Sequence, residues 1–189
     1  MARNSEWIQT YTGKQFHFDD IHPGDIDLET VAHVLSNLCR YGGHCREFYS
    51  VAEHSVNVSL AAEAAEAGTT CRSSLQEVAL QGLLHDATEA YCVDVPKPLK
   101  RMLRDYDAIE QRIWLAVAKH FGVPHDLFEA VRHADHTVLL AEQRVLMPDV
   151  GPDWFPEGVG LEPADVRIAC WGPTEAKRRF MHRFMGLMK

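Results

Sequence analysis

Ionisable side chains occur in this chain at positions where a helix would turn an apolar face inward. His54 stands three residues after Val51 and four residues before Val58. Residues at these spacings lie on the same face of a helix. Asp135 follows Val131 by four residues and continues its apolar series in the same way. The two side chains are therefore predicted to point into the interior rather than into solvent.

A third segment shows the same pattern. His85, Asp86 and Glu89 extend a series that passes through Val78 and Gly82 at steps of three and four residues. A buried carboxylate costs several kcal/mol unless it is paired or bound to a metal. The carboxylates of Asp86 and Asp135, with Glu89 nearby, would repel one another without a shared cation. The spacing therefore predicts a metal site between these three helices.

The predicted ligands are two imidazoles and two carboxylates, from His54, His85, Asp86 and Asp135. Nitrogen and oxygen donors of this kind suit Zn²⁺, Mn²⁺, Co²⁺ or Fe²⁺ and leave coordination positions open for water and substrate. A metal with open positions lowers the pKa of a bound water to about 7, which makes the water a nucleophile at neutral pH. Hydrolysis is the predicted chemistry.

Each of these residues also has an ordinary structural explanation. A single histidine on an apolar face usually serves a hydrogen bond in the core, and a single inward aspartate usually pairs with an arginine. His44, in the segment GGHC, is an alternative first ligand. It is flanked by glycines rather than by an apolar stripe, so His54 is the better candidate.

The elements that must position these residues are mainly helices. Apolar residues at helical spacing predict helices at about 28–38, 51–65, 75–90, 105–121, 126–146 and 174–187. Residues 7–26 predict a short hairpin or an irregular lead-in, and the stretch 148–173, rich in proline and glycine, predicts mostly loop. No repeat or linker divides the chain. We expect one all-α domain, a helical bundle over residues 1–189.

Composition limits the classes of protein to consider. With 189 residues, of which 46% are hydrophobic, the chain can bury a core without cross-links. A formal charge of −8 argues against a nucleic-acid binder, but not against a small phosphorylated substrate. No stretch has the length of a membrane span or the apolar core of a signal peptide. The five cysteines form no C-x-x-C pair, so we expect reduced thiols in a cytoplasmic protein.

The motifs resemble those of the HD-domain phosphohydrolases, in which a first His, an adjacent His-Asp and a distant Asp surround one metal. Here these are His54 in SVAEHSVNVS, His85-Asp86 in GLLHDATEAY and Asp135 in RHADHTVL. The strings E-H-S and H-D-A-T-E-A-Y-x-x-D-V-P are similar to the small branch with bacterial 5′-deoxynucleotidases and phage deoxyadenosine triphosphate triphosphohydrolases. The lead-in LSNLCRYGGHCREFYSVAEHS looks more like the phage-type members. The likeness covers roughly residues 20–140.

The resemblance implies further roles for individual residues. Glu89 would be the catalytic acid/base that orients or deprotonates the attacking water, and Asp94 would assist it or bind the substrate. Arg40 would contact phosphate, and Lys100 would be a second phosphate contact suited to a longer polyphosphate. Tyr41 would be an aromatic group beside the substrate, a tyrosine where the family leads us to expect tryptophan.

The expected activity is metal-dependent hydrolysis of a 2′-deoxynucleotide. The first choice is a deoxynucleoside triphosphate, dATP, giving deoxynucleoside and triphosphate, with additional Mg²⁺ on the substrate phosphates. A 5′-deoxynucleotidase that acts on monophosphates is the alternative within the class. By analogy with small HD enzymes, we also expect a homo-oligomer that binds a nucleotide but neither nucleic acid nor membrane.

Two rivals come from other classes. A nucleotide-binding regulator could keep the metal without turnover, although it would have little need for Glu89 and Asp94 beside the metal. A helical di-iron oxygenase would need Glu-x-x-His pairs on two helices, and these residues contain no such pair. Metal-dependent hydrolysis therefore remains the first prediction.

Overall fold

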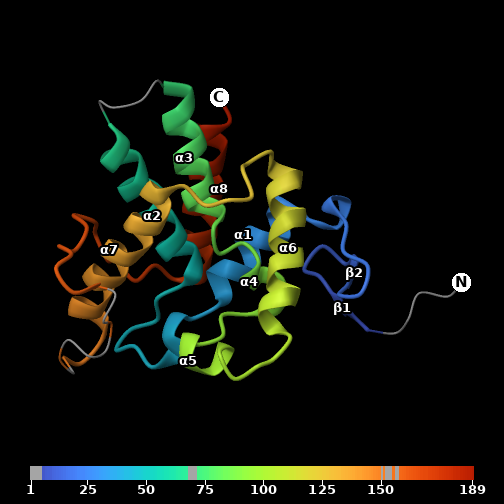
Figure 1. Cartoon of the computed structure of the whole chain (residues 1–189), viewed down its shortest axis with the longest axis horizontal. Coiled ribbons are helices and arrows are strands. Elements are labelled where there is room, and N and C mark those ends of the chain that lie inside the picture. Colours follow the sequence, from blue (N-terminus) through green and yellow to red (C-terminus); the bar gives the residue numbers. More distant parts are fainter. Residues whose placement is uncertain (1–5, 68–71, 150, 152–154, 156–157) are drawn as a thin grey trace, which may run out of the picture.

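A computed structural model describes residues 6–67, 72–149, 151, 155 and 158–189, and the side chains of 72–74 are not described. The fold is all-α, as predicted (Figure 1). Its helices are α1 (Leu28–Asn37), α2 (Val51–Glu66), α3 (Arg72–Leu84), α4 (Glu89–Cys92), α5 (Lys97–Lys100), α6 (Tyr106–Phe121), α7 (Glu129–Leu146) and α8 (Pro173–Leu187). Short 3₁₀ turns cover Pro23–Asp25 and Arg40–Gly43.

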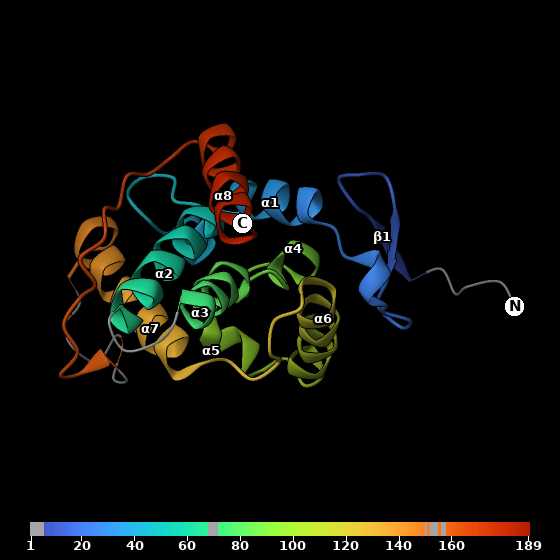
Figure 2. The same ribbon diagram turned by 90° about the horizontal axis from the view of Figure 1, so that it is seen from above.

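The lead-in is a small hairpin. Strands β1 (Trp7–Gln9) and β2 (Gln15–His17) pair antiparallel, with Ile8 opposite Phe16. Figures 1 and 2 both place this hairpin at the far end of the molecule from α7. It therefore covers the other end of the bundle from the helix that carries Asp135.

Two predicted boundaries were wrong. The third predicted helix does not run to Ala90, because α3 ends at Leu84 and α4 begins at Glu89 after a turn. Between the third and fourth predicted helices, Lys97–Lys100 forms the additional short helix α5. The fifth predicted helix begins at Glu129 rather than near residue 126. Gly68, where the second apolar series ends, and several residues of the 148–173 loop lie outside the described residues.

Local sequence explains where the helices begin and end. Asp27 accepts a hydrogen bond from the amide of Thr30 at 2.8 Å, and Ser50 accepts one from the amide of Glu53 at 3.1 Å. Such N-caps satisfy amides that have no partner inside the helix. At the other end of α6, Gly122 takes a left-handed conformation with φ of 72°. This conformation ends the helix cleanly.

Helix α2 lies at the centre of the bundle and packs against α3, α7 and α8. The close approach of α3 depends on Gly82, where a Cβ atom would lie 3.2 Å from the Cα of Ser59 in α2. A core that includes Leu35, Leu83, Ile113 and Phe180 spans the helices on one side. A second cluster of small apolar residues joins α2 to α7. The two helices that carry His54 and Asp135 are thus packed face to face.

Two buried polar side chains attach loop segments to α2 and α3, the helices next to the predicted ligands. Glu53, fully buried in α2, accepts backbone amides of Ala169, Cys170 and Trp171 at 2.7, 3.0 and 2.6 Å. Burial raises the pKa of Glu53, and these three hydrogen bonds oppose the rise. The contacts attach the segment before α8 to the residue next to His54.

Gln81 does the same for the segment before α7. Its side chain is fully buried, donates to the carbonyls of Pro124 and Asp126 and accepts from the amide of Phe128 at 2.7 Å. Gln81 lies in α3, one turn before His85. It therefore connects the start of α7 to the helix that ends at the predicted site.

Among the described residues, none of the helices has both the length and the apolar character needed to cross a membrane. The thiols of Cys39, Cys45, Cys92 and Cys170 are free. Cys71 lies outside the described residues.

Candidate metal centre

His54 is fully buried in the middle of α2, as the apolar spacing predicted. Its Nδ1 lies 2.6 Å from Oε1 of Glu142 on α7. A carboxylate only accepts hydrogen bonds, so Nδ1 donates to Glu142 and Nε2 is the nitrogen left to bind a metal. That Nε2 atom faces the other predicted ligands.

His85 lies in the turn just after α3, not inside a helix. The amides of Ala87 and Glu89 bond to carbonyls three residues earlier, at 2.9 and 3.0 Å. This tighter turn replaces the α-helical pattern and separates His85 from Glu89. The Nδ1 atom of His85 lies 2.8 Å from the carbonyl oxygen of Gly82, which likewise leaves Nε2 with its lone pair. The two Nε2 atoms of His54 and His85 are 3.3 Å apart.

The two aspartates converge on the same atoms. Oδ1 of Asp135 lies 3.1 Å from Nε2 of His54 and 3.8 Å from Nε2 of His85. Oδ2 of Asp86 lies 3.5 and 3.3 Å from the same two nitrogens. Four donor atoms from three parts of the chain therefore meet around one point, as the spacing predicted.

His54, His85 and Asp135 form a group that could hold a metal ion, because one donor atom of each lies within 4.8 Å of the others. The donor set also fits chemically. Both imidazoles are oriented by an acceptor at Nδ1, which is the usual arrangement of histidine ligands. Asp86 lies beside this group, and Nη1 of Arg40 contacts its Oδ2 at 3.5 Å.

The charges around the site favour a bound cation. Burial and the Arg40 charge would lower the pKa of His54, but Glu142 and hydrogen bonds to Asp135 and Glu142 raise it to about 9. Burial would raise the pKa of Asp135, but hydrogen bonding to His54 and the two imidazoles hold it well below its ordinary value. A divalent cation would satisfy the same negative charge and displace the proton from His54.

Glu142 is a buried residue of the candidate site that the sequence patterns did not single out. It is fully buried and accepts hydrogen bonds from Nε of Arg40 at 3.2 Å and the hydroxyl of Tyr41 at 2.6 Å, besides its bond to His54. Burial would raise the pKa of Glu142, but Arg40 and His54 hold it at about 2. One signal was present in the sequence, since Glu142 lies two helical turns after Asp135 on the same face.

Replacement of Glu142 by alanine is expected to lower both stability and metal affinity. The change leaves Arg40 and Tyr41 without their buried partner and frees the ring of His54. Loss of one member of a buried ion pair costs about 3–5 kcal/mol, and loss of the carboxylate behind a histidine ligand lowers metal affinity about 10–100-fold. Denaturant unfolding and metal titration would measure the two losses.

Glu129→Ala is the matched control, because Glu129 is an exposed residue of the same helix that forms an ion pair with Arg132. This control should change stability by less than about 0.5 kcal/mol. Wild-type metal affinity in Glu142→Ala would show that Glu142 does not orient His54.

Arg40 and Tyr41 lie in a tight turn between α1 and α2. Tyr41 has a left-handed backbone with φ of 57°, which is uncommon for a residue with a side chain. Arg40 is largely buried, with a side chain 11% exposed, between Glu142 and Asp86. The structure thus brings Arg40 to the predicted ligands, and the Tyr41 hydroxyl donates a hydrogen bond to Glu142.

Glu89 begins α4 and is buried beside the ligands. Its Oε2 atom is buried and has no hydrogen-bond partner among the described residues. Burial raises the pKa of Glu89 well above its ordinary value, the charges of Asp86 and Asp94 raise it further, and Arg40 and Lys100 oppose the rise. A carboxyl group whose pKa is raised is better matched to accept a proton than an ordinary carboxyl group.

Asp94 and Lys100 are the remaining residues that were predicted to assist catalysis or to bind the substrate. Burial raises the pKa of Asp94, which interacts electrostatically with Arg40, Asp86 and His54. Asp94 therefore lies close to the site. The Lys100 ammonium forms an ion pair with Glu110 at 2.7 Å and lies over the ring of Tyr106. It also interacts electrostatically with Glu89. Lys100 is thus near the site and already engaged by a carboxylate.

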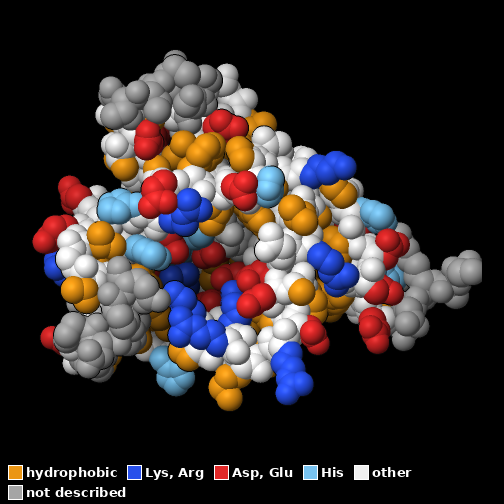
Figure 3. Space-filling model, viewed as in Figure 1, with side chains coloured by type: hydrophobic (Ala, Val, Ile, Leu, Met, Phe, Trp, Pro, Cys, Tyr) orange, Lys and Arg blue, Asp and Glu red, His pale blue; other side chains and the backbone are white. Residues whose placement is uncertain are grey.

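Figure 3 shows acidic side chains gathered in a hollow between α6 and α7, with basic side chains along its edge above α5. His44, the alternative ligand, is exposed, and the ligand group found within the described ranges uses His54 instead. The preference for His54 is therefore supported.

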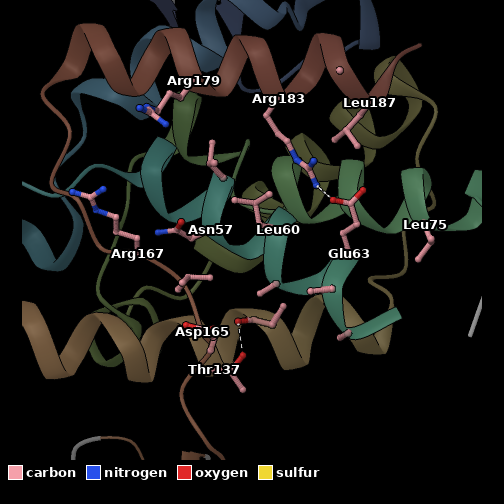
Figure 4. A pocket seen from close by; sticks show the side chains of 18 of the residues that line it. Asn57, Leu60, Glu63, Leu75, Thr137, Asp165, Arg167, Arg179, Arg183 and Leu187 are labelled. Atoms are coloured by element: carbon pink, nitrogen blue, oxygen red, sulfur yellow. Dashed lines mark hydrogen bonds and ion pairs between the residues drawn. The ribbon is translucent and has the colours of Figure 1, made fainter. Parts of the chain in front are cut away.

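A separate cavity of about 1170 Å³ opens between α2, α7 and α8. Figure 4 shows Arg167, Arg179 and Asn57 toward one end of it, and Leu60 near its middle. Arg183 spans it to pair with Glu63 at 2.8 Å. None of the predicted ligands is among the described residues that line this cavity, so it is distinct from the metal centre.

Comparisons with known proteins place the chain in a family. No family model matches the sequence. The chain is 32% identical over 131 residues to the uncharacterized protein RCAP_rcc00048 of Rhodobacter capsulatus, an alignment that covers 68% of this chain and 64% of the relative. It is 38% identical over 182 residues to the uncharacterized protein YfdR of Escherichia coli K12, covering 96% of this chain and 95% of the relative. The chain therefore belongs to the family of YfdR.

Proposed function

We propose that the protein is a metal-dependent phosphohydrolase that acts on 2′-deoxynucleotides. The observation that carries the proposal is the convergence of His54, His85 and Asp135 on one point, beside a buried carboxyl group of Glu89. Purely structural ion pairs would leave no reason for an unpartnered carboxyl oxygen next to three ligating groups. A hydrolytic centre needs both a cation and a proton acceptor.

The ligand set suits a divalent transition metal, Zn²⁺, Mn²⁺, Co²⁺ or Fe²⁺. Such a metal, when bound, would lower the pKa of a water molecule and neutralise charge on a phosphate. The protein supplies the fixed imidazole orientation through Glu142 and the carbonyl of Gly82. This preorganised geometry avoids the cost of rearranging ligands during the reaction.

Arg40 is the proposed phosphate-binding group. Its guanidinium lies between Asp86 and Glu142, and its Nε donates to Glu142. The remaining N–H groups can donate to phosphate oxygens in the bidentate geometry that arginine favours. Burial beside the ligands makes this interaction stronger than it would be in water.

Glu89 is the proposed acid/base. It would accept the proton of the attacking water and return it to the leaving oxygen, a role worth about 10²–10⁴-fold in rate. Asp94 raises the pKa of Glu89 through its negative charge. We therefore assign Asp94 to the assistance of Glu89 rather than to the metal.

The substrate class rests on the likeness of the E-H-S and H-D-A-T-E-A-Y-x-x-D-V-P strings to deoxynucleotide hydrolases. Our first choice is a deoxynucleoside triphosphate, dATP, cleaved at the α-phosphorus to deoxynucleoside and triphosphate. A second candidate is a 5′-deoxynucleotidase. The ion pair between Lys100 and Glu110 favours it, because a lysine already neutralised is a poorer partner for β- and γ-phosphates.

Product analysis tests the proposal. Metal-free protein would be reloaded separately with Mn²⁺, Co²⁺, Zn²⁺ or Fe²⁺ and incubated with deoxynucleoside mono- and triphosphates. With dATP as substrate, we expect anion-exchange chromatography to show deoxynucleoside and inorganic triphosphate as the products. Orthophosphate as the first product would contradict cleavage at the α-phosphorus. Tight nucleotide binding without turnover under every condition would identify a regulator instead.

Lys100→Ala distinguishes the two candidate substrates. If Lys100 contacts the β- and γ-phosphates, its loss should weaken triphosphate hydrolysis by about 1.5–3 kcal/mol in kcat/KM and affect monophosphate hydrolysis much less. The exposed Lys97, on the same short helix, supplies the control variant Lys97→Ala. Equal losses on both substrates in Lys100→Ala would favour the 5′-deoxynucleotidase.

A further inference from the structure

Two thiols face each other across the turn that carries Arg40. The Sγ atoms of Cys39 and Cys45 are 3.6 Å apart, and both residues are partly exposed. The Cys45 thiol also lies 3.8 Å from the carbonyl oxygen of Arg40. The pair therefore brackets Arg40 and Tyr41, which both donate to Glu142.

The backbone brings these two sulfurs together. Tyr41, Gly42 and Gly43 have φ of 57°, 58° and 82°, three left-handed residues in succession that reverse the chain. The far side of the turn is tied down, because the amide of Arg46 donates to the carbonyl of Leu146 at 3.0 Å. The turn thus starts and ends at fixed points.

The near side of the turn is equally fixed. Cys39 forms an antiparallel bridge with Ser50, the N-cap of α2, and the amide of Arg40 donates to the carbonyl of Tyr49 at 2.9 Å. The contact between the two sulfurs is thus set by several backbone hydrogen bonds. A disulfide needs a sulfur separation of about 2.05 Å, so the two side chains would have to close by roughly 1.5 Å.

We propose that Cys39 and Cys45 form a reversible disulfide that clamps the Arg40 turn and so regulates the site. The disulfide itself is independent of the activity, whereas its regulatory role rests on the proposed function. The oxidant is an organic disulfide such as oxidised glutathione. Disulfides of this kind in otherwise reduced proteins are usually transient and redox-sensing.

The exchange balances in two steps. One cysteine thiolate attacks a sulfur of oxidised glutathione, which forms a mixed disulfide and releases one glutathione thiolate. The second cysteine thiolate attacks the protein sulfur of that mixed disulfide, forms the Cys39–Cys45 bond and releases the second glutathione. Two electrons pass from the protein to glutathione, and the two thiol protons accompany them.

Two effects should follow from the bond. It closes a short loop and restricts the unfolded chain, which should raise Tm by about 4–8 °C. It also moves Cys39 toward Cys45 and so displaces the neighbouring Arg40. A displacement of 1 Å in a positioned group can slow a reaction on the order of 10²-fold. We expect the oxidised enzyme to hydrolyse its substrate about tenfold more slowly, and reductant should restore the rate.

The test uses the full chain, treated with oxidised glutathione under native conditions. Trypsin cleaves after Arg40 and Arg46, so a disulfide would join the peptide 15–40 to the peptide 41–46. We expect this linked pair and a loss of two thiols in the wild type and in the control Cys92→Ser/Cys170→Ser. Cys39→Ser/Cys45→Ser should show neither.

The results separate the two parts of the proposal. Glutathione adducts on Cys39 and Cys45 without the linked peptides would overturn the disulfide. The linked peptides with unchanged Tm and unchanged turnover would overturn the clamp. If the reduced, metal-loaded protein hydrolyses no nucleotide, the proposed function fails, and the peptides and Tm still decide whether the clamp exists.

Discussion

Replacement of His85 or Asp135 by alanine is expected to abolish both metal binding and hydrolysis. Each side chain supplies a donor atom to the group that could hold the ion, and the remaining donors make an incomplete set. Metal analysis of the purified variants should give far less than one ion per chain, and product chromatography should show no activity above background.

The thermal behaviour of these variants provides a second readout. A ligand that binds only the folded state stabilises it, so added metal should raise Tm of the wild type and leave the variants unchanged. His133→Ala is the control, because His133 is exposed on α7 two residues before Asp135. Full metal content in both variants would remove the site assignment.

Glu89→Gln is expected to keep the metal and to slow turnover by about 10²–10⁴-fold. Glutamine has nearly the same shape as glutamate but cannot accept the proton of the attacking water. The effect should fall on kcat, with metal content and nucleotide affinity close to those of the wild type. Stopped assays of product at saturating nucleotide, together with metal analysis, would measure it.

The pH dependence gives a more specific signature of Glu89. The base must be deprotonated, and its pKa is raised above its ordinary value. The wild-type rate should therefore fall as pH falls through that raised pKa, and Glu89→Gln should lose this limb of the profile. Glu77→Gln, on an exposed position of α3, should behave as the wild type. Normal turnover in Glu89→Gln would make Glu89 structural, and loss of its metal would make it a ligand.

The likeness to YfdR extends these experiments beyond one chain. The alignment with YfdR covers 96% of this chain and 95% of the relative. Product analysis of YfdR on the same nucleotides would test whether the proposed function belongs to the family.

Much of the site could be predicted from the sequence, because helical periodicity is a local property. His54 and Asp135 stand at apolar spacings within long helices, α2 and α7, and the two side chains point toward each other, with His54 fully buried and the Asp135 side chain 37% exposed. In α7, which has an exposed side, the spacing alone indicates which residues face inward, whereas α2 is buried on every side from Val51 to Ser59. The same reasoning placed most helix boundaries near their observed positions.

Tertiary structure decided the rest. Local periodicity extended the third helix through His85 to Ala90, whereas the chain turns after Leu84 and His85 instead bonds to Gly82. Nothing local distinguishes an α-helix from a tighter helical turn over so few residues.

Glu142 could be recognised only from the packing of α2 against α7, because its partners lie 88 to 102 positions away in the chain. The contact between Cys39 and Cys45 depends in the same way on left-handed residues and distant anchors. The sequence by itself determined which side chains share a helix face, since that choice is made within a few residues. Which of them meet, and which carboxylate holds the first histidine in place, depended on how distant helices pack together.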